Sequence, residues 1–178
     1  LKYAAQHNVN FLFEASVGGG IPIIRPISQC LAANEIDEFA GILNGTTNFI
    51  LTKMINDNMA FEDALKLAQD NGYAERDPSA DILGFDACRK VCILASLCFG
   101  KHVYPEQVHT EGITEITLED VDYAKDWGGV IKLLGRARKS EDGKHIYAIV
   151  SPAFVNHHSQ LASVDDVFNA ILVRGDAI

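Results

Sequence analysis

The order of helix-like and strand-like segments is the feature that most constrains how this chain can fold. Strand patterns occur at 9–17, 36–43, 129–155 (two strands joined at Glu141–Gly143) and 166–173. Helix patterns occur at 23–34, 48–58, 60–73, 78–99 and 117–128. Because the helices come in runs and do not alternate strictly with strands, a doubly wound parallel sheet is disfavoured. The order predicts an α+β fold, with a mixed, mostly antiparallel sheet and helices packed on one face.

Local signals predict where several of these elements begin and end. Glycines at 18–20 should break the first strand, and Pro26 should shorten or bend the helix that follows. Thr46 or Thr47 could cap the helix after the second strand. A single long helix is expected from Pro78 to Phe99.

Charge and hydropathy exclude two classes of partner. The net charge of -9 would repel a phosphate backbone, and no basic stripe with interleaved aromatic residues offsets that charge. No apolar run approaches the roughly 20 residues that span a bilayer, since Val91–Phe99 is short and contains Ser96. We therefore expect a soluble protein that binds neither nucleic acid nor membrane.

The cysteines favour a reducing compartment. They form neither a C-x-x-C motif nor the dense framework of a secreted domain. Two of them, one helical turn apart, could share a metal, but no further His or Cys ligand lies near them in sequence. We interpret all four as reduced core residues of a cytoplasmic protein: Cys30, Cys88, Cys92 and Cys98.

An acidic cluster precedes the most apolar segment. On a helix, Asp86 and Lys90 are four residues apart and lie at the border of an apolar stripe, so we expect both heads to be half-buried. Alone, such a pair is usually a surface ion pair, and acids near Pro78 complement a helix dipole. Glu75 and Asp81 extend the cluster. Together the charges suit a small substrate with an ammonium group and a hydroxyl or carbonyl, which a lysine could protonate.

The segment AQDNGYAERDPSADILGFDACRK, residues 68–90, resembles the signature segment of the homoserine dehydrogenase family. Similar blocks of that family are EASVGGGIP at 14–22, GILNGTTNFIL at 41–51 and LASVDDVFNAILVRGD at 161–176, in the same order. The resemblance implies NAD(P)H-dependent reduction of L-aspartate 4-semialdehyde to L-homoserine, on the route to threonine, methionine and isoleucine. It also implies a homodimer formed through the sheet.

The resemblance assigns roles to individual residues. Lys90 would be the catalytic proton donor. Glu75 and Asp86 would bind the amino acid, and Tyr73, Thr46 and Asp81 would line its pocket. Gly72 would face the nicotinamide cofactor, NADP or NAD, through its backbone. The backbone carbonyls of four residues would bind a monovalent cation, usually sodium: Glu14, Val17, Gly19 and Ile21.

The glycine turn at 18–20 permits two interpretations from the residues alone. Position 23 is Ile, where a dinucleotide-binding loop would carry its third glycine, so a phosphate cradle is disfavoured. The turn could direct carbonyl oxygens toward a hard cation, or it could be purely structural. Two other motifs favour structural roles over functional ones. Asn44-Gly45-Thr46 is expected to be a helix entry instead of a glycosylation site, and His157 and His158 are expected to be exposed side chains.

We expect the chain to be part of a longer protein. It begins with Leu1, without a signal-peptide pattern, and its last residues, ILVRGDAI, resemble a strand that runs into a turn without a terminal tail. The resemblance makes residues 1–178 a substrate-binding, catalytic and dimerisation domain. It places the nucleotide-binding domain and a second catalytic lysine upstream, so the piece alone should be inactive. Two alternatives remain: the substrate domain of another NAD(P)-dependent oxidoreductase, and a non-catalytic dimerisation or ligand-sensing module.

Overall fold

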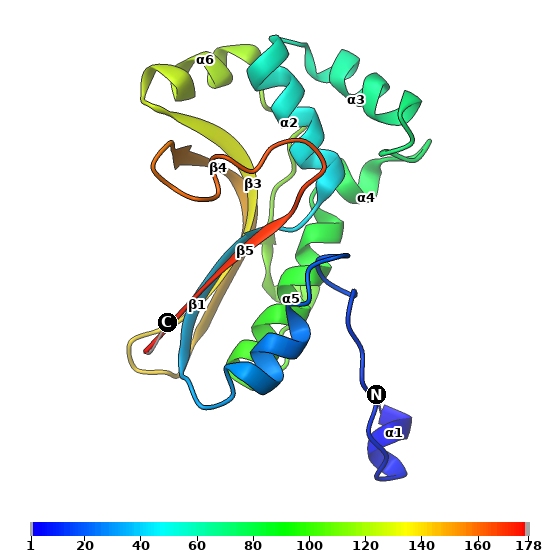
Figure 1. The fold of residues 1–178 in the computed structure, drawn as a ribbon, viewed down its shortest axis with the longest axis vertical. Helices are drawn as coiled ribbons and strands as arrows, with labels where there is room; N and C mark the ends of the chain where they lie inside the picture. Colours follow the sequence, from blue (N-terminus) through cyan, green and yellow to red (C-terminus); the bar gives the residue numbers. More distant parts are fainter. Residues whose placement is uncertain (1, 177–178) are drawn as a thin grey trace.

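A five-stranded sheet organises the protein in the computed structural model, which describes residues 2–176 (Figure 1). Its spatial order is β2-β4-β3-β1-β5, and every pairing is antiparallel except that of β2 with β4. The predicted α+β class and mostly antiparallel sheet are confirmed. The strands are β1 (Ile36–Ile42), β2 (His109–Thr110), β3 (Gly129–Lys139), β4 (Ile146–Asn156) and β5 (Ala170–Gly175).

Most of the helices pack on one face of the sheet, whereas α1 (Lys2–Gln6) lies apart from it (Figure 1). In β3, Gly135 faces helix α5, because a Cβ at that position would lie 2.5 Å from a methyl carbon of Val91. Arg136 and Arg138, on either side of buried Ala137, point to the opposite face, as alternation along a strand requires. The helices are α1 (Lys2–Gln6), α2 (Gly45–Asp57), α3 (Phe61–Asp70), α4 (Ser79–Ile82), α5 (Phe85–Phe99) and α6 (Leu118–Asp126), with a π-helical turn at Pro26–Cys30 and a 3₁₀ turn at Pro105–Gln107.

The longest predicted helix is in fact two. Gly84 has φ of 81°, a left-handed conformation that cannot continue an α-helix, so α4 ends before it and α5 begins after it. The chain bends there because Gly84 packs against the segment that follows β2: a Cβ on Gly84 would lie 3.2 Å from the Glu111 carbonyl oxygen. Our prediction of one uninterrupted helix was wrong at this point.

Three further predictions are corrected. Residues 9–17 form no strand: no strand within residues 2–176 lies beside them, and Leu12 is 85% exposed. The helix expected over 23–34 is only a short turn. The N-cap of α2 is Asn44, one position before the helix, instead of Thr46 or Thr47.

The cysteine prediction holds only in part. All four thiols are free; Cys88 and Cys92 are buried and Cys98 is partly buried, but Cys30 is exposed at the end of the π-helical turn. None of the helices in residues 2–176 has both the length and the apolar character to cross a bilayer.

Candidate active site

Asn44 lies at the centre of a polar cluster where β1 passes into α2. Its side-chain oxygen accepts hydrogen bonds from the Thr47 backbone N–H, at 2.9 Å, and from the Thr47 hydroxyl, at 3.0 Å. Its amide nitrogen donates to Asp81 Oδ1, at 2.7 Å, and to Asp86 Oδ2, at 2.8 Å. Both amide hydrogens are therefore committed to carboxylates. One side chain begins the helix and also holds two acidic groups together.

The bend between α4 and α5 brings the two aspartates to Asn44. Asp81 lies in α4, and Asp86 lies in the first turn of α5, after the bend at Gly84. The Ile113 N–H donates to the Ile82 carbonyl at 2.8 Å, so the segment after β2 supports this bend. The bend therefore matters for the site, because a single straight helix would hold Asp81 and Asp86 apart along its axis.

Lys90 completes the cluster on the next turn of α5. Its Nζ donates to Asp86 Oδ2, at 2.6 Å, and to the Leu43 backbone carbonyl, at 2.9 Å. The side chains of Lys90 and Asp86 are 22% and 29% exposed, which confirms the predicted half-burial. An ammonium group has three N–H donors, and only two have partners among the described residues. The third is available to a ligand at a partly desolvated position.

Thr46 and the Tyr73 backbone form a second contact beside this cluster. The Thr46 hydroxyl donates to the Tyr73 carbonyl at 2.7 Å, and the Tyr73 ring packs edge-on against Phe49 at 5.0 Å between centroids. Tyr73 remains 47% exposed. Gly72 precedes it with φ of 75°, and no atom lies within 4 Å of the point that a Cβ would occupy, so its backbone is open to approach.

Glu75 lies outside the hydrogen-bonded cluster. Its residue is exposed, its backbone carbonyl accepts a hydrogen bond from Gln69 at 3.1 Å, and its carboxylate contacts no polar partner within residues 2–176. Asp77 has a local role: it accepts hydrogen bonds from the Ser79 hydroxyl and backbone N–H, which together lower the pKa of the Asp77 carboxyl. Two groups of the predicted residues are thus joined by hydrogen bonds. Asn44 links Asp81 to Asp86, which binds Lys90. Separately, Thr46 binds the Tyr73 carbonyl.

The glycine turn reverses the chain through left-handed conformations at Ala15, Gly18 and Gly20. Burial raises the pKa of Glu14, but hydrogen bonds from the Ile24 and Arg25 N–H groups, at 2.9 and 2.8 Å, outweigh it and leave that pKa lowered. The Glu14 carboxylate is therefore held in its ionised form by the backbone that follows the turn.

The four carbonyls predicted to bind a cation differ in their hydrogen bonding. Those of Glu14 and Ile21 accept from Ser16 and Ile23 at 2.7 and 2.9 Å, whereas those of Val17 and Gly19 accept from no described residue. Carbonyl oxygens are ligands that hard cations prefer. The donor set fits a cation, and the cation site stays a prediction.

Neither the cysteines nor the exposed histidines supply a competing site. Burial, followed by the neighbouring Cys88, raises the pKa of Cys92 to about 12, and burial raises the pKa of Cys98 to about 12. Both thiols therefore stay protonated and unreactive at neutral pH. His157 and His158 are exposed, as predicted, and within residues 2–176 no three His, Cys, Asp or Glu side chains are grouped to hold a metal.

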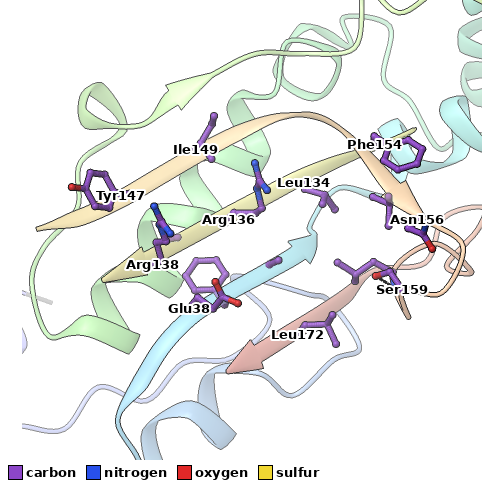
Figure 2. A pocket seen from close by; sticks show the side chains of 15 residues that line it. Glu38, Leu134, Arg136, Arg138, Tyr147, Ile149, Phe154, Asn156, Ser159 and Leu172 are labelled. Atoms are coloured by element: carbon purple, nitrogen blue, oxygen red, sulfur yellow. Dashed lines mark hydrogen bonds between the residues drawn. The ribbon is translucent and has the colours of Figure 1, made fainter. Parts of the chain in front are cut away.

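A hollow lies on the open face of the sheet, opposite helix α5, which carries Lys90. It encloses about 600 Å³ between β1, β3 and β4, and Figure 2 shows Arg136, Arg138 and Tyr147 projecting into it. None of the predicted substrate or cofactor residues lines it. We therefore assign the candidate active site to the Asn44 cluster and not to this hollow.

Sequence reasoning misses four residues that the structure makes important. The local pattern marks Asn44 only as part of a turn, although its place directly after a strand is a usable signal. A lysine inside the apolar run VIKLL is a second usable signal. The missed residues are Asn44, Asn48, Lys132 and Asn169.

Comparisons with known proteins agree on one family. The profile of homoserine dehydrogenase matches residues 22–178. The chain is 48% identical over 177 residues to homoserine dehydrogenase of Synechocystis sp., covering 98% of the chain and 41% of that protein. A crystal structure of the Thiobacillus denitrificans enzyme superposes with a TM-score of 0.94 at 48% identity, covering 99% of this chain and 41% of that one.

A more distant structure carries a cofactor. It is a hyperthermophilic archaeal homoserine dehydrogenase in complex with NADPH, with a TM-score of 0.81 at 29% identity, and covers 98% of this chain and 49% of that one. The chain therefore spans about 41% of the first two proteins it matches.

Proposed function

This chain belongs to the homoserine dehydrogenase family, and from that premise we propose that it is the substrate-binding and catalytic part of an enzyme that interconverts L-aspartate 4-semialdehyde and L-homoserine. The observation that carries the proposal is the hydrogen bonding of Lys90, whose ammonium is held by Asp86 and the Leu43 carbonyl with one N–H left over. A held ammonium with a free donor is suited to proton transfer.

Lys90 acts as the acid in the direction of reduction. When bound, the nicotinamide cofactor supplies the hydride to the aldehyde carbon. The free N–H of Lys90 hydrogen-bonds the aldehyde oxygen and transfers its proton to that oxygen as negative charge develops there. The remaining amine keeps the Leu43 carbonyl and Asp86 as acceptors, so it does not lose its position. In the direction of oxidation the neutral amine takes the hydroxyl proton.

The carboxylates bind the amino acid part of the substrate. Asp81 and Asp86 each give one oxygen to Asn44, which leaves other lone pairs for the substrate ammonium. Glu75, which has no partner among residues 2–176, is free to turn toward the same group. Thr46 and Tyr73 line the pocket beside them. The open backbone of Gly72 allows close approach of the nicotinamide ring.

The remaining parts of the proposal concern the whole protein. The nucleotide-binding domain and a second catalytic lysine lie elsewhere in the longer polypeptide, consistent with a chain that spans 41% of its relatives. NADPH or NADH is the cofactor; a family member binds NADPH. We propose a cytoplasmic homodimer that forms through the open face of the sheet, a sodium ion in the glycine turn, and a role in threonine, methionine and isoleucine biosynthesis.

The test is oxidation of homoserine by the full-length protein. We expect homoserine-dependent reduction of NADP or NAD, followed by absorbance of the reduced nicotinamide. Activity with another hydroxy acid or a sugar, and none with homoserine, would assign the chain to a different oxidoreductase. Absence of any nicotinamide-dependent turnover in a folded, full-length protein would favour a non-catalytic binding module.

Replacing Glu75 with alanine should chiefly weaken substrate binding. Loss of one charge-assisted hydrogen bond to an ammonium costs about 2 kcal/mol, so KM for homoserine should rise about 30-fold while kcat changes less than about threefold. Steady-state kinetics of the full-length protein measure both. Glu141, exposed in the turn between β3 and β4, gives a control, since Glu141→Ala removes the same charge outside the site. A normal KM in Glu75→Ala would remove Glu75 from the pocket.

A further inference from the structure

A second polar cluster is buried next to the candidate site. Asn48, Thr52 and Lys132 are 1%, 3% and 0% exposed, although each carries hydrogen-bonding groups. Asn48 and Thr52 lie on α2, and Lys132 lies on β3. All three contact the segment Val164–Phe168, which connects the end of β4 to β5. Burial of three polar side chains is costly unless their partners are specific.

Asn48 holds the backbone of this segment at three points. Its amide nitrogen lies within hydrogen-bonding distance of the carbonyls of Val164, Asp166 and Phe168, at 3.0, 3.0 and 3.2 Å. The Thr52 hydroxyl accepts from the Asp166 N–H at 3.0 Å. Asp166 has φ of 53°, a left-handed conformation that Asp adopts more readily than most residues other than glycine. The contacts with Asn48 and Thr52 therefore fix this segment against α2.

Lys132 supplies the charge in this cluster. Its Nζ donates to the Val164 carbonyl at 2.7 Å, to Asp165 Oδ1 at 3.1 Å and to Asn48 Oδ1 at 3.2 Å. Burial lowers the pKa of Lys132, and the hydrogen bond and charge of Asp165 oppose that shift. All three N–H donors have partners, so the ammonium is fully occupied within the protein.

The segment held in this way ends at the active site. Val167 packs on the first residue of α2, because a Cβ at Gly45 would lie 2.7 Å from the Val167 carbonyl oxygen. Asn169 follows, and its amide nitrogen reaches the Leu43 carbonyl in a long hydrogen bond of 3.5 Å. That carbonyl is the one that accepts from Lys90 at 2.9 Å. Asn169 and Lys90 thus share one acceptor.

One further observation sets Asn169 apart. Its side-chain oxygen is buried and has no hydrogen-bond donor among residues 2–176. A buried acceptor without a partner costs free energy, and a leucine of similar volume would avoid that cost. The amide is thus not explained by the stability of the segment.

We propose that Asn169 is a positioning residue for Lys90, acting through the shared Leu43 carbonyl, and that the buried Lys132–Asn48 pair holds the segment that delivers it. Asn169 keeps the Leu43 carbonyl directed at Lys90, so that the Lys90 nitrogen stays in place when it loses a proton. This inference rests on the proposed function, since it takes Lys90 as the catalytic acid. It adds three residues that act through others instead of on the substrate: Asn169, Lys132 and Asn48.

Two substitutions at Asn169 in the full-length protein test the proposal. Asn169→Leu removes the amide at similar volume; we expect kcat to fall about tenfold with KM for homoserine within about threefold, because misplacing a proton donor acts on the transition state. Asn169→Asp also adds a negative charge near Lys90, whose charged neighbours are already Asp86 and, beyond Asn44, Asp81. The added carboxylate favours the charged form of the Lys90 amine, so the pH dependence of kcat should move to higher pH.

The control for added charge is Asn34→Asp, at the far end of β1 from Leu43, which should leave kcat and its pH profile unchanged. Unchanged kcat in Asn169→Leu, or a pH profile of Asn169→Asp that does not move, would overturn the positioning role. Either result tests a property that a purely structural residue would not affect.

Lys132→Met tests the other end of the network. We expect a lower unfolding temperature and, at a temperature where the variant is still folded, the same fall in kcat with unchanged KM. Lys66→Met, in an exposed lysine–aspartate pair on α3, should change neither. A folded Lys132→Met protein with normal kcat would limit Lys132 to a structural role and overturn its part in the proposal. If Lys132→Met does not fold, Asp165→Asn takes its place, because it weakens the carboxylate contact of the same ammonium. A fall in kcat with unchanged KM is again expected, and a normal kcat would again overturn the role of Lys132.

A readout without activity separates this inference from the proposed function. The rate at which an amine reagent modifies Lys90, followed by mass spectrometry at fixed pH, reports its neutral fraction. Asn169→Asp should slow modification about tenfold, because the added carboxylate favours the unreactive ammonium, whether or not homoserine is the substrate. If the wild-type protein does not oxidise homoserine, the proposed function fails while this measurement still decides the contact between Asn169 and Lys90.

Discussion

Replacing Lys90 with alanine is expected to lower kcat of the full-length protein by about 10²- to 10⁴-fold, the range that a single general acid contributes. KM for homoserine should change less than about threefold. In the proposed mechanism Lys90 gives its free N–H to an oxygen whose charge develops only in the transition state, while Asp81 and Asp86 would still bind the substrate ammonium. An interaction made chiefly in the transition state affects kcat more than KM.

The measurement needs a control for folding. Without Lys90, Asp86 keeps its hydrogen bond to Asn44, so we expect a native thermal transition with only a small decrease in stability. Lys66→Ala removes an exposed lysine and should leave kcat intact. Undiminished turnover by a folded Lys90→Ala protein would reject Lys90 as the proton donor.

The second large effect is expected from Gly112→Ala, on stability. A Cβ at Gly112 would lie 2.0 Å from the Ile82 carbonyl oxygen and 2.5 Å from the Leu83 Cα. Both are backbone atoms and cannot rotate away. The clash must push the end of α4 outward, which we expect to lower the free energy of unfolding by about 3 kcal/mol. Because α4 carries Asp81, the same movement should weaken its 2.7 Å contact with Asn44 and raise KM.

Chemical denaturation of this variant and of Gly143→Ala would separate steric from conformational effects. Gly143 has φ of 66° but nothing within 4 Å of a Cβ position, so its substitution should cost only about 1 kcal/mol. Equal costs for the two variants would mean that the contact between residue 112 and the α4–α5 bend is not tight.

Local sequence patterns found the residues of the site that lie on one element. Asp86 and Lys90 are one helical turn apart at the border of an apolar stripe, and that spacing was enough to predict their pairing and half-burial. Asn44 is 37 residues from Asp81 and 42 from Asp86, so no local spacing could connect them. Asn169 and Lys132 were missed for the same reason. Contacts of this kind exist only after the sheet brings distant segments together.

The errors in the fold have related physical causes. The apolar run at 9–17 has the composition of a strand, but a strand also needs a partner for its backbone, and none lies beside it within residues 2–176. In the sequence, Gly84 looks like a glycine that a helix can tolerate. Its left-handed conformation depends on the segment 110–113, which packs against it only in the folded protein. Strands β3 and β4, which are apolar segments joined by a glycine-containing turn, were predicted correctly because these signals are local.

The double use of Asn44 has a consequence for motion. Its oxygen secures the first turn of α2 through the Thr47 amide, while its nitrogen secures the two carboxylates. Fraying of that turn and loosening of the acidic pair are therefore one event with one opening free energy. The rate at which the Thr47 amide exchanges its hydrogen for deuterium should thus report how often the acidic pair of the candidate site loosens.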